Sequence, residues 1–118
     1  MRFFVPVKTV NPLNGTHRHW RAVAAGRRRQ REAVVRSWLA DLSAEARACE
    51  RGGPFAITLT RCSSGTLDGD GLQAALKTIR DQVADCLGFR NDADPALTWI
   101  YAQRKCARGV FGVEVEIK

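Results

Sequence analysis

Two aspartates one residue apart are the clearest candidates for chemistry in this sequence. Asp68 and Asp70 lie in Leu67-Asp-Gly-Asp-Gly-Leu72, a glycine-rich turn that opens a predicted helix. Aspartate is favoured as a helix N-cap because its carboxylate accepts backbone N–H groups that have no other partner. Two carboxylates at positions i and i+2 can also aim at one point, where a hard cation such as Mg²⁺ relieves their repulsion. The motif alone leaves the cap and the metal interpretations open.

A second acidic turn and a lysine strengthen the metal interpretation. Asn91-Asp-Ala-Asp94-Pro95 follows the same predicted helix, and Lys77 lies seven residues after Asp70, on roughly the same helical face. Metal-bound carboxylates activate a nucleophile and stabilise charge on a phosphorane, and a lysine offsets the negative charge that develops. A plain turn and a solvated helix position are the alternatives for each residue alone. Together the two acidic turns and Lys77 predict phosphodiester hydrolysis at a metal site. The predicted metal ligands are Asp68, Asp70, Asp92 and Asp94.

The distribution of charge indicates a phosphate-binding end. The net charge is +7, and residues 1–36 hold nine basic residues and one acidic residue, whereas the rest holds ten basic and eleven acidic. Such a field attracts nucleic acid, with RNA, acidic lipid or a merely solvated helix face as alternatives. The predicted nucleic-acid-binding residues lie in an Asn/Arg-rich loop and at the start of the first helix: Asn14, His17, Arg18, His19, Arg21, Arg27, Arg28, Arg29 and Arg31.

The apolar periodicity predicts one α/β or α+β domain over residues 1–118, in the order βαβαββ, with a mixed four-stranded sheet and two main helices. The first strand contains Phe3, Val5 and Val7, and Pro6 indicates a sheet edge. The predicted helices run from about Arg27 to Glu50 and from about Gly71 to Leu87. The other predicted strands are Phe55–Leu59, Leu97–Tyr101 and Phe111–Ile117.

The four cysteines are widely scattered and form no CxxC pair. We therefore expect small apolar residues here and neither a zinc site nor a disulfide. No apolar run approaches the roughly 20 residues that span a bilayer, and no secretory leader is recognisable. These features predict a soluble, cytoplasmic protein without a membrane partner.

Residues 67–95 resemble the RusA family of Holliday junction resolvases, which occur in phages and prophages. The signature of that family is an Asp-x-Asp-Asn-Leu turn, a lysine on the following helix, a helical aspartate and an acidic turn before the next strand. The loop Asn11-Pro-Leu-Asn14…Arg18 is similar to the family's early Pro/Asn/Arg loop. The chain departs from the signature at Gly71, where the family has Asn, and at Lys77, which lies later on the helix but is followed by Asp81 at the matching distance.

The resemblance implies a homodimeric, Mg²⁺-dependent endodeoxyribonuclease, with Mn²⁺ as a substitute, in a bacterial or phage-infected cell. It implies that the protein resolves four-way junctions by symmetric nicking in DNA recombination and repair. Asp68, Asp70 and Asp92 would match the metal-binding aspartates, and Lys77 the essential lysine. The alternatives are a non-catalytic DNA- or RNA-binding module and a nuclease for other branched DNA, such as flaps and forks.

Helix length predicts how the two acidic turns meet. A helix over 71–87 is roughly 25 Å long, and the five residues 88–92 reach back at most about 17 Å. Both turns can hardly bind one ion within one chain. We therefore expect a two-fold dimer in which Asp68 and Asp70 of one subunit meet Asp92 of the partner subunit, an arrangement that suits the symmetry of a junction.

Overall fold

Four strands form one mixed sheet, as the sequence predicts. The computed structural model describes residues 1–10, 20–40 and 53–118. The strands are β1 (Arg2–Val5), β2 (Phe55–Ser63), β3 (Leu97–Lys105) and β4 (Gly112–Ile117), in the spatial order β1-β4-β2-β3. β2 and β3 are parallel, whereas β4 is antiparallel to β1 and to β2. The predicted order of elements and the edge position of the first strand are confirmed, and Pro6 follows directly after β1.

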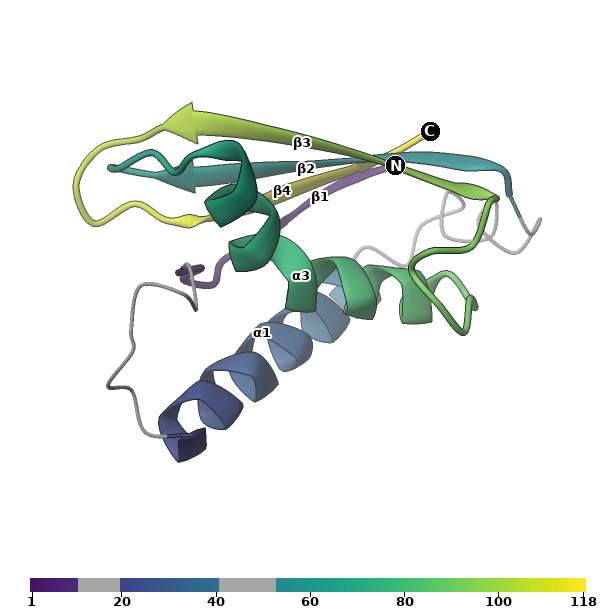
Figure 1. Cartoon of the computed structure of the whole chain (residues 1–118), viewed down its shortest axis with the longest axis horizontal. Coiled ribbons are helices and arrows are strands. Elements are labelled where there is room, and N and C mark those ends of the chain that lie inside the picture. Colours follow the sequence, from purple (N-terminus) through teal and green to yellow (C-terminus); the bar gives the residue numbers. More distant parts are fainter. Residues whose placement is uncertain (11–19, 41–52) are drawn as a thin grey trace.

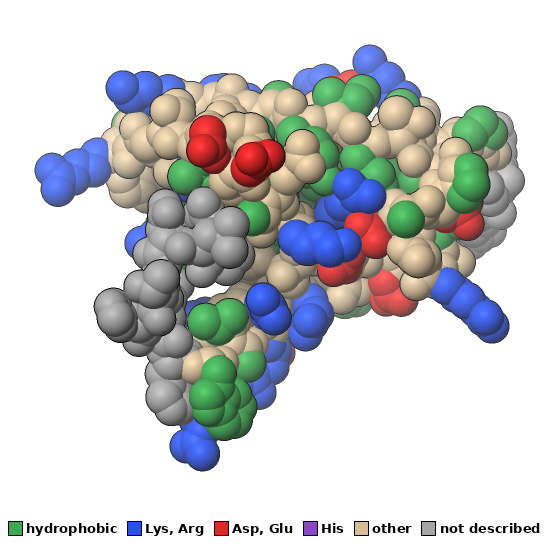
Figure 2. Space-filling view, in the orientation of Figure 1, with side chains coloured by type: hydrophobic (Ala, Val, Ile, Leu, Met, Phe, Trp, Pro, Cys, Tyr) green, Lys and Arg blue, Asp and Glu red, His purple; other side chains and the backbone are tan. Residues whose placement is uncertain are grey.

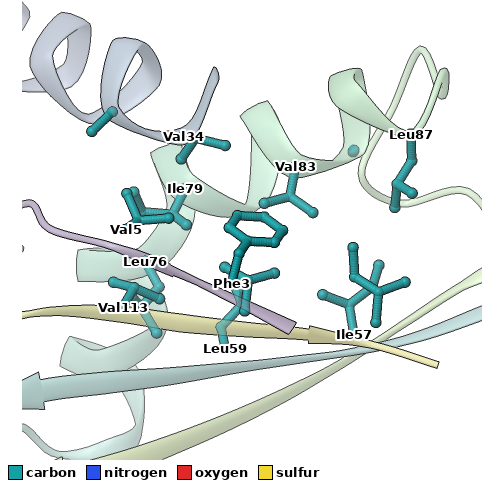
Figure 3. Close-up of a cluster of buried hydrophobic side chains, with 14 of the residues drawn as sticks. Phe3, Val5, Val34, Ile57, Leu59, Leu76, Ile79, Val83, Leu87 and Val113 are labelled. Atoms are coloured by element: carbon teal, nitrogen blue, oxygen red, sulfur yellow. The ribbon is translucent and has the colours of Figure 1, made fainter. Parts of the chain in front are cut away.

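Helices α1 (Trp20–Ala40) and α3 (Gly69–Cys86) lie on the same face of the sheet (Figure 1). α3 turns a continuous apolar stripe, from Leu76 and Ile79 to Val83, toward the sheet. There it meets strand residues such as Ile57 and Leu59, and none of these five side chains is exposed to solvent (Figure 3). This core carries most of the hydrophobic stabilisation of the domain, because that free energy grows with the apolar area removed from water.

α1 is attached to this core only through its second half. Its buried residues are Gln30, Ala33 and Val34, while its first half diverges from the sheet (Figure 1). The helix begins at Trp20, so the start predicted at Arg27 was wrong. Residues 20–26 are rich in alanine, a strong helix former, but lack the apolar repeat from which the start was predicted. The predicted end near Glu50 lies outside the described residues.

A disulfide joins the ends of the parallel strand pair. β3 continues beyond the predicted end at Tyr101 and stays paired with β2 as far as Ser63. Cys62 and Cys106 therefore come side by side, with Cα atoms 5.8 Å apart, and form a disulfide. The expectation that no cysteine forms a disulfide is wrong, because 44 positions of sequence separation hid a pairing that the sheet register creates. Within the described ranges, no helix is long and apolar enough to cross a membrane.

Candidate functional site

The first acidic turn holds one capping and one free carboxylate. Asp68 is the N-cap of α3, and its Oδ1 accepts a hydrogen bond from the Gly71 backbone N–H at 2.7 Å. The turn is also tied to β3, because the Gln103 amide exchanges two hydrogen bonds with the Leu67 backbone, at 2.9 and 2.7 Å. Asp70 is exposed in the first helical turn, and no hydrogen bond or ion pair joins its carboxylate to any described residue. Capping therefore explains Asp68 and leaves Asp70 unexplained.

The buried Arg61 stabilises the loop that leads to this turn. Arg61 is 8% exposed on β2; it donates to Thr9 Oγ1 at 3.1 Å, Thr9 O at 3.2 Å and Gly65 O at 3.1 Å. Burial lowers the pKa of its guanidinium, because desolvation disfavours the charged form. Arg61 was not among the residues predicted from the sequence, although the alternation that buries Ile57 and Leu59 also turns position 61 toward the helices. Arg61 thus fixes the chain after β1 relative to the loop that leads to Asp68.

The second acidic turn contains a carboxylate neutralised by two cations. Asp92 Oδ2 lies 2.8 Å from Lys77 Nζ and 2.5 Å from Arg80 Nε, the latter an ion-pair contact without hydrogen-bond alignment. Burial alone would raise the pKa of Asp92, but the Lys77 hydrogen bond and the Arg80 charge outweigh it and lower that pKa. Hydrogen bonds to Asp92 and, at 2.9 Å, to Asp81 raise the pKa of Lys77. Lys77 and Asp92 are thus brought together, but as an ion pair.

Aromatic residues of β3 fix the backbone of the same turn. The Trp99 indole N–H donates to Asp92 O at 2.7 Å, and the Arg80 guanidinium stacks on the Trp99 ring, 5.0 Å from its centroid. Arg80 also donates to the Tyr101 hydroxyl at 2.6 Å. The position of Asp92 therefore depends on Arg80, a residue that the sequence analysis did not single out.

The two acidic turns remain apart within one chain. Asp94 forms a plain turn, in which its Oδ1 accepts from the Ala96 N–H at 2.9 Å. No three metal-ligating side chains meet anywhere in the described part of the chain. α3 is unbroken, and the rise from Asp70 to Lys77 is about 10 Å along its axis. The continuous helix that the dimer hypothesis assumes is therefore present, while the dimer itself stays a prediction.

A basic cleft opens between the first half of α1, α3 and the segment after β1. Its volume is about 760 Å³. The charged residues that line it are Lys8, Arg27, Arg29, Arg31, Lys77 and Asp81. Figure 2 shows the hollow beside α1, with basic side chains along that helix. Of these five cations only Lys77 forms an ion pair with another described residue, so four of them have no ion-pair partner in the described part of the chain.

The predicted nucleic-acid-binding residues lie in different places. Arg27, Arg29 and Arg31 line the cleft, and Arg28 does not. Arg21 is helical rather than part of a loop, and its guanidinium lies 5.2 Å from the ring centroid of its neighbour Trp20. The remaining predicted residues lie outside the described part of the chain: Asn14, His17, Arg18 and His19.

The cleft and the free carboxylate share one face of α3. Ala74, Lys77, Thr78 and Asp81 line the cleft at helical spacing, and Asp70 precedes Ala74 by one turn on that face. A phosphate chain lying in the cleft would therefore run toward Asp70. Lys8 was not singled out by the sequence analysis, because it enters the cleft only through the course of the chain after β1.

Comparison of this chain with protein-family models, with curated proteins and with solved structures finds no match.

Proposed function

We propose that this protein is a metal-dependent endonuclease that cuts branched DNA, with the four-way junction as its first candidate substrate. The observation that carries the proposal is the free Asp70 carboxylate on the α3 face that also lines a basic cleft. A nucleic acid held by the cleft cations would present its phosphodiester backbone to this end of the helix. The resemblance of residues 67–95 to RusA-type resolvases supports the same substrate class.

The two carboxylates of the first turn fit a hard cation. Mg²⁺ takes one or two protein carboxylates and completes its shell with water and phosphate oxygens. Asp68 has its second oxygen, Oδ2, without a hydrogen bond to any described residue, and Asp70 has both. When bound, such an ion supplies a more acidic water and stabilises charge on the phosphoryl group. Asp68 and Asp70 would hold it, and the cleft arginines would orient the DNA.

Lys77 and Asp92 would have different roles in such a nuclease. Lys77 lines the cleft and would donate a hydrogen bond to a phosphate oxygen of the bound DNA, although Asp81 and Asp92 already compensate its charge. Asp92 would orient Lys77 in its own chain. Both cations contact Oδ2 of Asp92, so a metal ion would have to bind the other oxygen, Oδ1, beside two positive charges. The dimer hypothesis assigns the ligand role to Asp92 of the partner subunit.

The test is Mg²⁺-dependent nicking of a synthetic four-way junction by three variants that are matched in charge. Asp70→Asn and Asp68→Asn each remove one carboxylate, and asparagine is as good an N-cap as aspartate, so the helix start is retained. We expect each to reduce the nicking rate about 100-fold or more, because a ligand of the ion is lost. Asp85→Asn, at an exposed position of the same helix, is the control and should nick like the wild type.

Full activity of Asp70→Asn would contradict the proposal. Junction binding without nicking, at any concentration of Mg²⁺ or Mn²⁺, would favour the non-catalytic DNA-binding module, an alternative consistent with the capping role of Asp68 and the ion pairs of Asp92. Rates on junction, flap, fork and linear duplex rank the substrates. Mixing Asp70→Asn with Asp92→Asn subunits tests the composite dimer, because only shared sites regain one intact centre.

A further inference from the structure

We infer that the cleft beside α1 binds an unpaired DNA strand and seats a base against Phe111. The inference rests on the proposed function in taking DNA as the ligand, and it goes further by naming the structural element of DNA that is recognised. The lining of the cleft is mixed, because apolar side chains from the segment after β1, from α1, from α3 and from the residue before β4 join the basic ones: Val7, Val10, Ala22, Val23, Ala74 and Phe111.

The lining fits a base and its phosphates better than it fits a duplex. A volume of about 760 Å³ is in the size range of small-molecule pockets, which can enclose individual nucleotides. Paired DNA instead presents a groove into which a protein element inserts, so its bases do not enter a recess on the protein. Proteins that hold single strands combine a positive groove for the backbone with an aromatic surface for the bases.

Phe111 has the exposure and the support that a stacking surface needs. The residue is 44% exposed, and it borders the cleft where the chain enters β4. The next residue is Gly112, where a Cβ atom would lie 2.1 Å from Phe4 Cζ and 2.8 Å from Val5 O. Only glycine therefore lets β4 begin this close to β1, and that close approach fixes the backbone beside Phe111.

The charges of the cleft match a phosphodiester chain. Lys8, Arg27, Arg29 and Arg31 form no ion pair with any described residue, so an anionic ligand would gain their full attraction. Lys77 is compensated by Asp81 and Asp92 and adds little net charge. The uncompensated cations thus come from α1 and the segment after β1, and the strand would lie along that wall.

The experiment measures binding without metal, by fluorescence anisotropy of a labelled oligothymidylate in EDTA. The competitors are the same strand in a duplex and a strand of equal length made of abasic sites. We expect the thymidylate to bind at least about tenfold more tightly than the abasic strand, because a factor of this size corresponds to the free energy of stacking one base on an aromatic side chain. Phe111→Ala should remove this preference, while Val110→Ala, a neighbour that is 48% exposed and does not line the cleft, should keep it.

A second pair of variants, equal to each other in net charge, tests the cations. Arg27→Ala should weaken single-strand binding and reduce the slope of log affinity against log salt by about 0.7, the value for one phosphate contact. Arg28→Ala removes the same charge from the same helix but lies outside the lining, and its slope should equal that of the wild type. If Phe111→Ala unfolds, Phe111→Leu retains the apolar bulk and removes the stacking surface.

The inference is wrong if the protein binds single strand and duplex with equal affinity. It is also wrong if Arg27→Ala and Arg28→Ala have equal effects. Either result would favour a duplex lying along α1. These outcomes are independent of the proposed nuclease. A protein that prefers the unpaired strand but never nicks DNA contradicts the nuclease alone, and one that nicks junctions without this preference contradicts the cleft inference alone.

Discussion

Aspartates lie near both ends of α3, but they differ in whether a cation is paired with them. At the first end, Asp68 caps the helix and Asp70 has no charged partner among the described residues. Beyond the other end, the Asp92 carboxylate is 12% exposed and lies against Lys77 and Arg80. An aspartate near a helix start can thus remain available to a ligand, while one in a returning turn serves to attach that turn to the helix.

The interactions that stabilise the chain at the two ends of α3 differ as well. The first end is stabilised by neutral acceptors around the buried Arg61 and by the disulfide at the end of β2, and of its two carboxylates only Asp68 contributes, as the helix N-cap. The second end depends on the very carboxylate that the sequence suggested as a metal ligand. Removing the Asp70 carboxylate should therefore have little effect on stability, whereas removing that of Asp68 loses a helix cap and removing that of Asp92 loses an ion pair.

The largest effect on stability should come from the disulfide at the first end. Cys62 and Cys106 close a loop with a sequence separation of 44, and restricting the unfolded chain over such a length contributes about 3–4 kcal/mol. We expect reduction to lower the free energy of unfolding, measured by urea denaturation, by about 3 kcal/mol. The double variant Cys62→Ala/Cys106→Ala should be insensitive to reductant. Equal stability of the oxidised and reduced protein would show that this bridge does not hold the first end.

Loss of the Asp92 carboxylate should have the next largest effect. Asp92→Asn leaves two cations without their shared partner and should cost about 2 kcal/mol. The folded-state pKa of Asp92 is lowered, so its contribution is complete above the ordinary aspartate value of about 4 and is lost as the pH falls through the folded-state pKa. Urea unfolding of wild type and variant should thus differ at pH 7 and converge in acid. Asp81→Asn is the control, since its exposed i,i+4 pair with Lys77 contributes only about 0.3–0.5 kcal/mol. A pH-independent difference for Asp92→Asn would argue against the ion pairs.

The smallest effect on stability should come from Asp68, where two substitutions distinguish the capping hydrogen bond from the negative charge. Asp68→Ala should cost about 1 kcal/mol, because the Gly71 N–H loses its acceptor, whereas Asp68→Asn should cost almost nothing. Thermal unfolding of both variants measures this difference. If Asp68→Asn destabilises as much as Asp68→Ala, the negative charge and not the hydrogen bond maintains the helix start.

The candidate site was predictable only in part. The Leu67–Leu72 turn identified the start of α3 and its cap, because both are local properties of the chain. The pairing of Lys77 with Asp92 was not predictable, because it requires the chain to return along α3 after Gly88. The four predicted arginines between positions 27 and 31 were treated alike, and only their positions around α1 separated Arg28 from the three that line the cleft.

By itself, the sequence determined the types and order of the elements, the apolar stripe of α3 and the edge position of β1. Each of these follows from periodicity or from the backbone of a single residue such as Pro6, which acts over a few positions of chain. Tertiary structure decided which distant residues became neighbours. The register of β2 and β3 joined Cys62 to Cys106, the burial of Arg61 tied Thr9 to Gly65, and the divergence of α1 opened the cleft. For the two ends of α3, the sequence supplied the aspartates, and packing determined which of them has a charged partner.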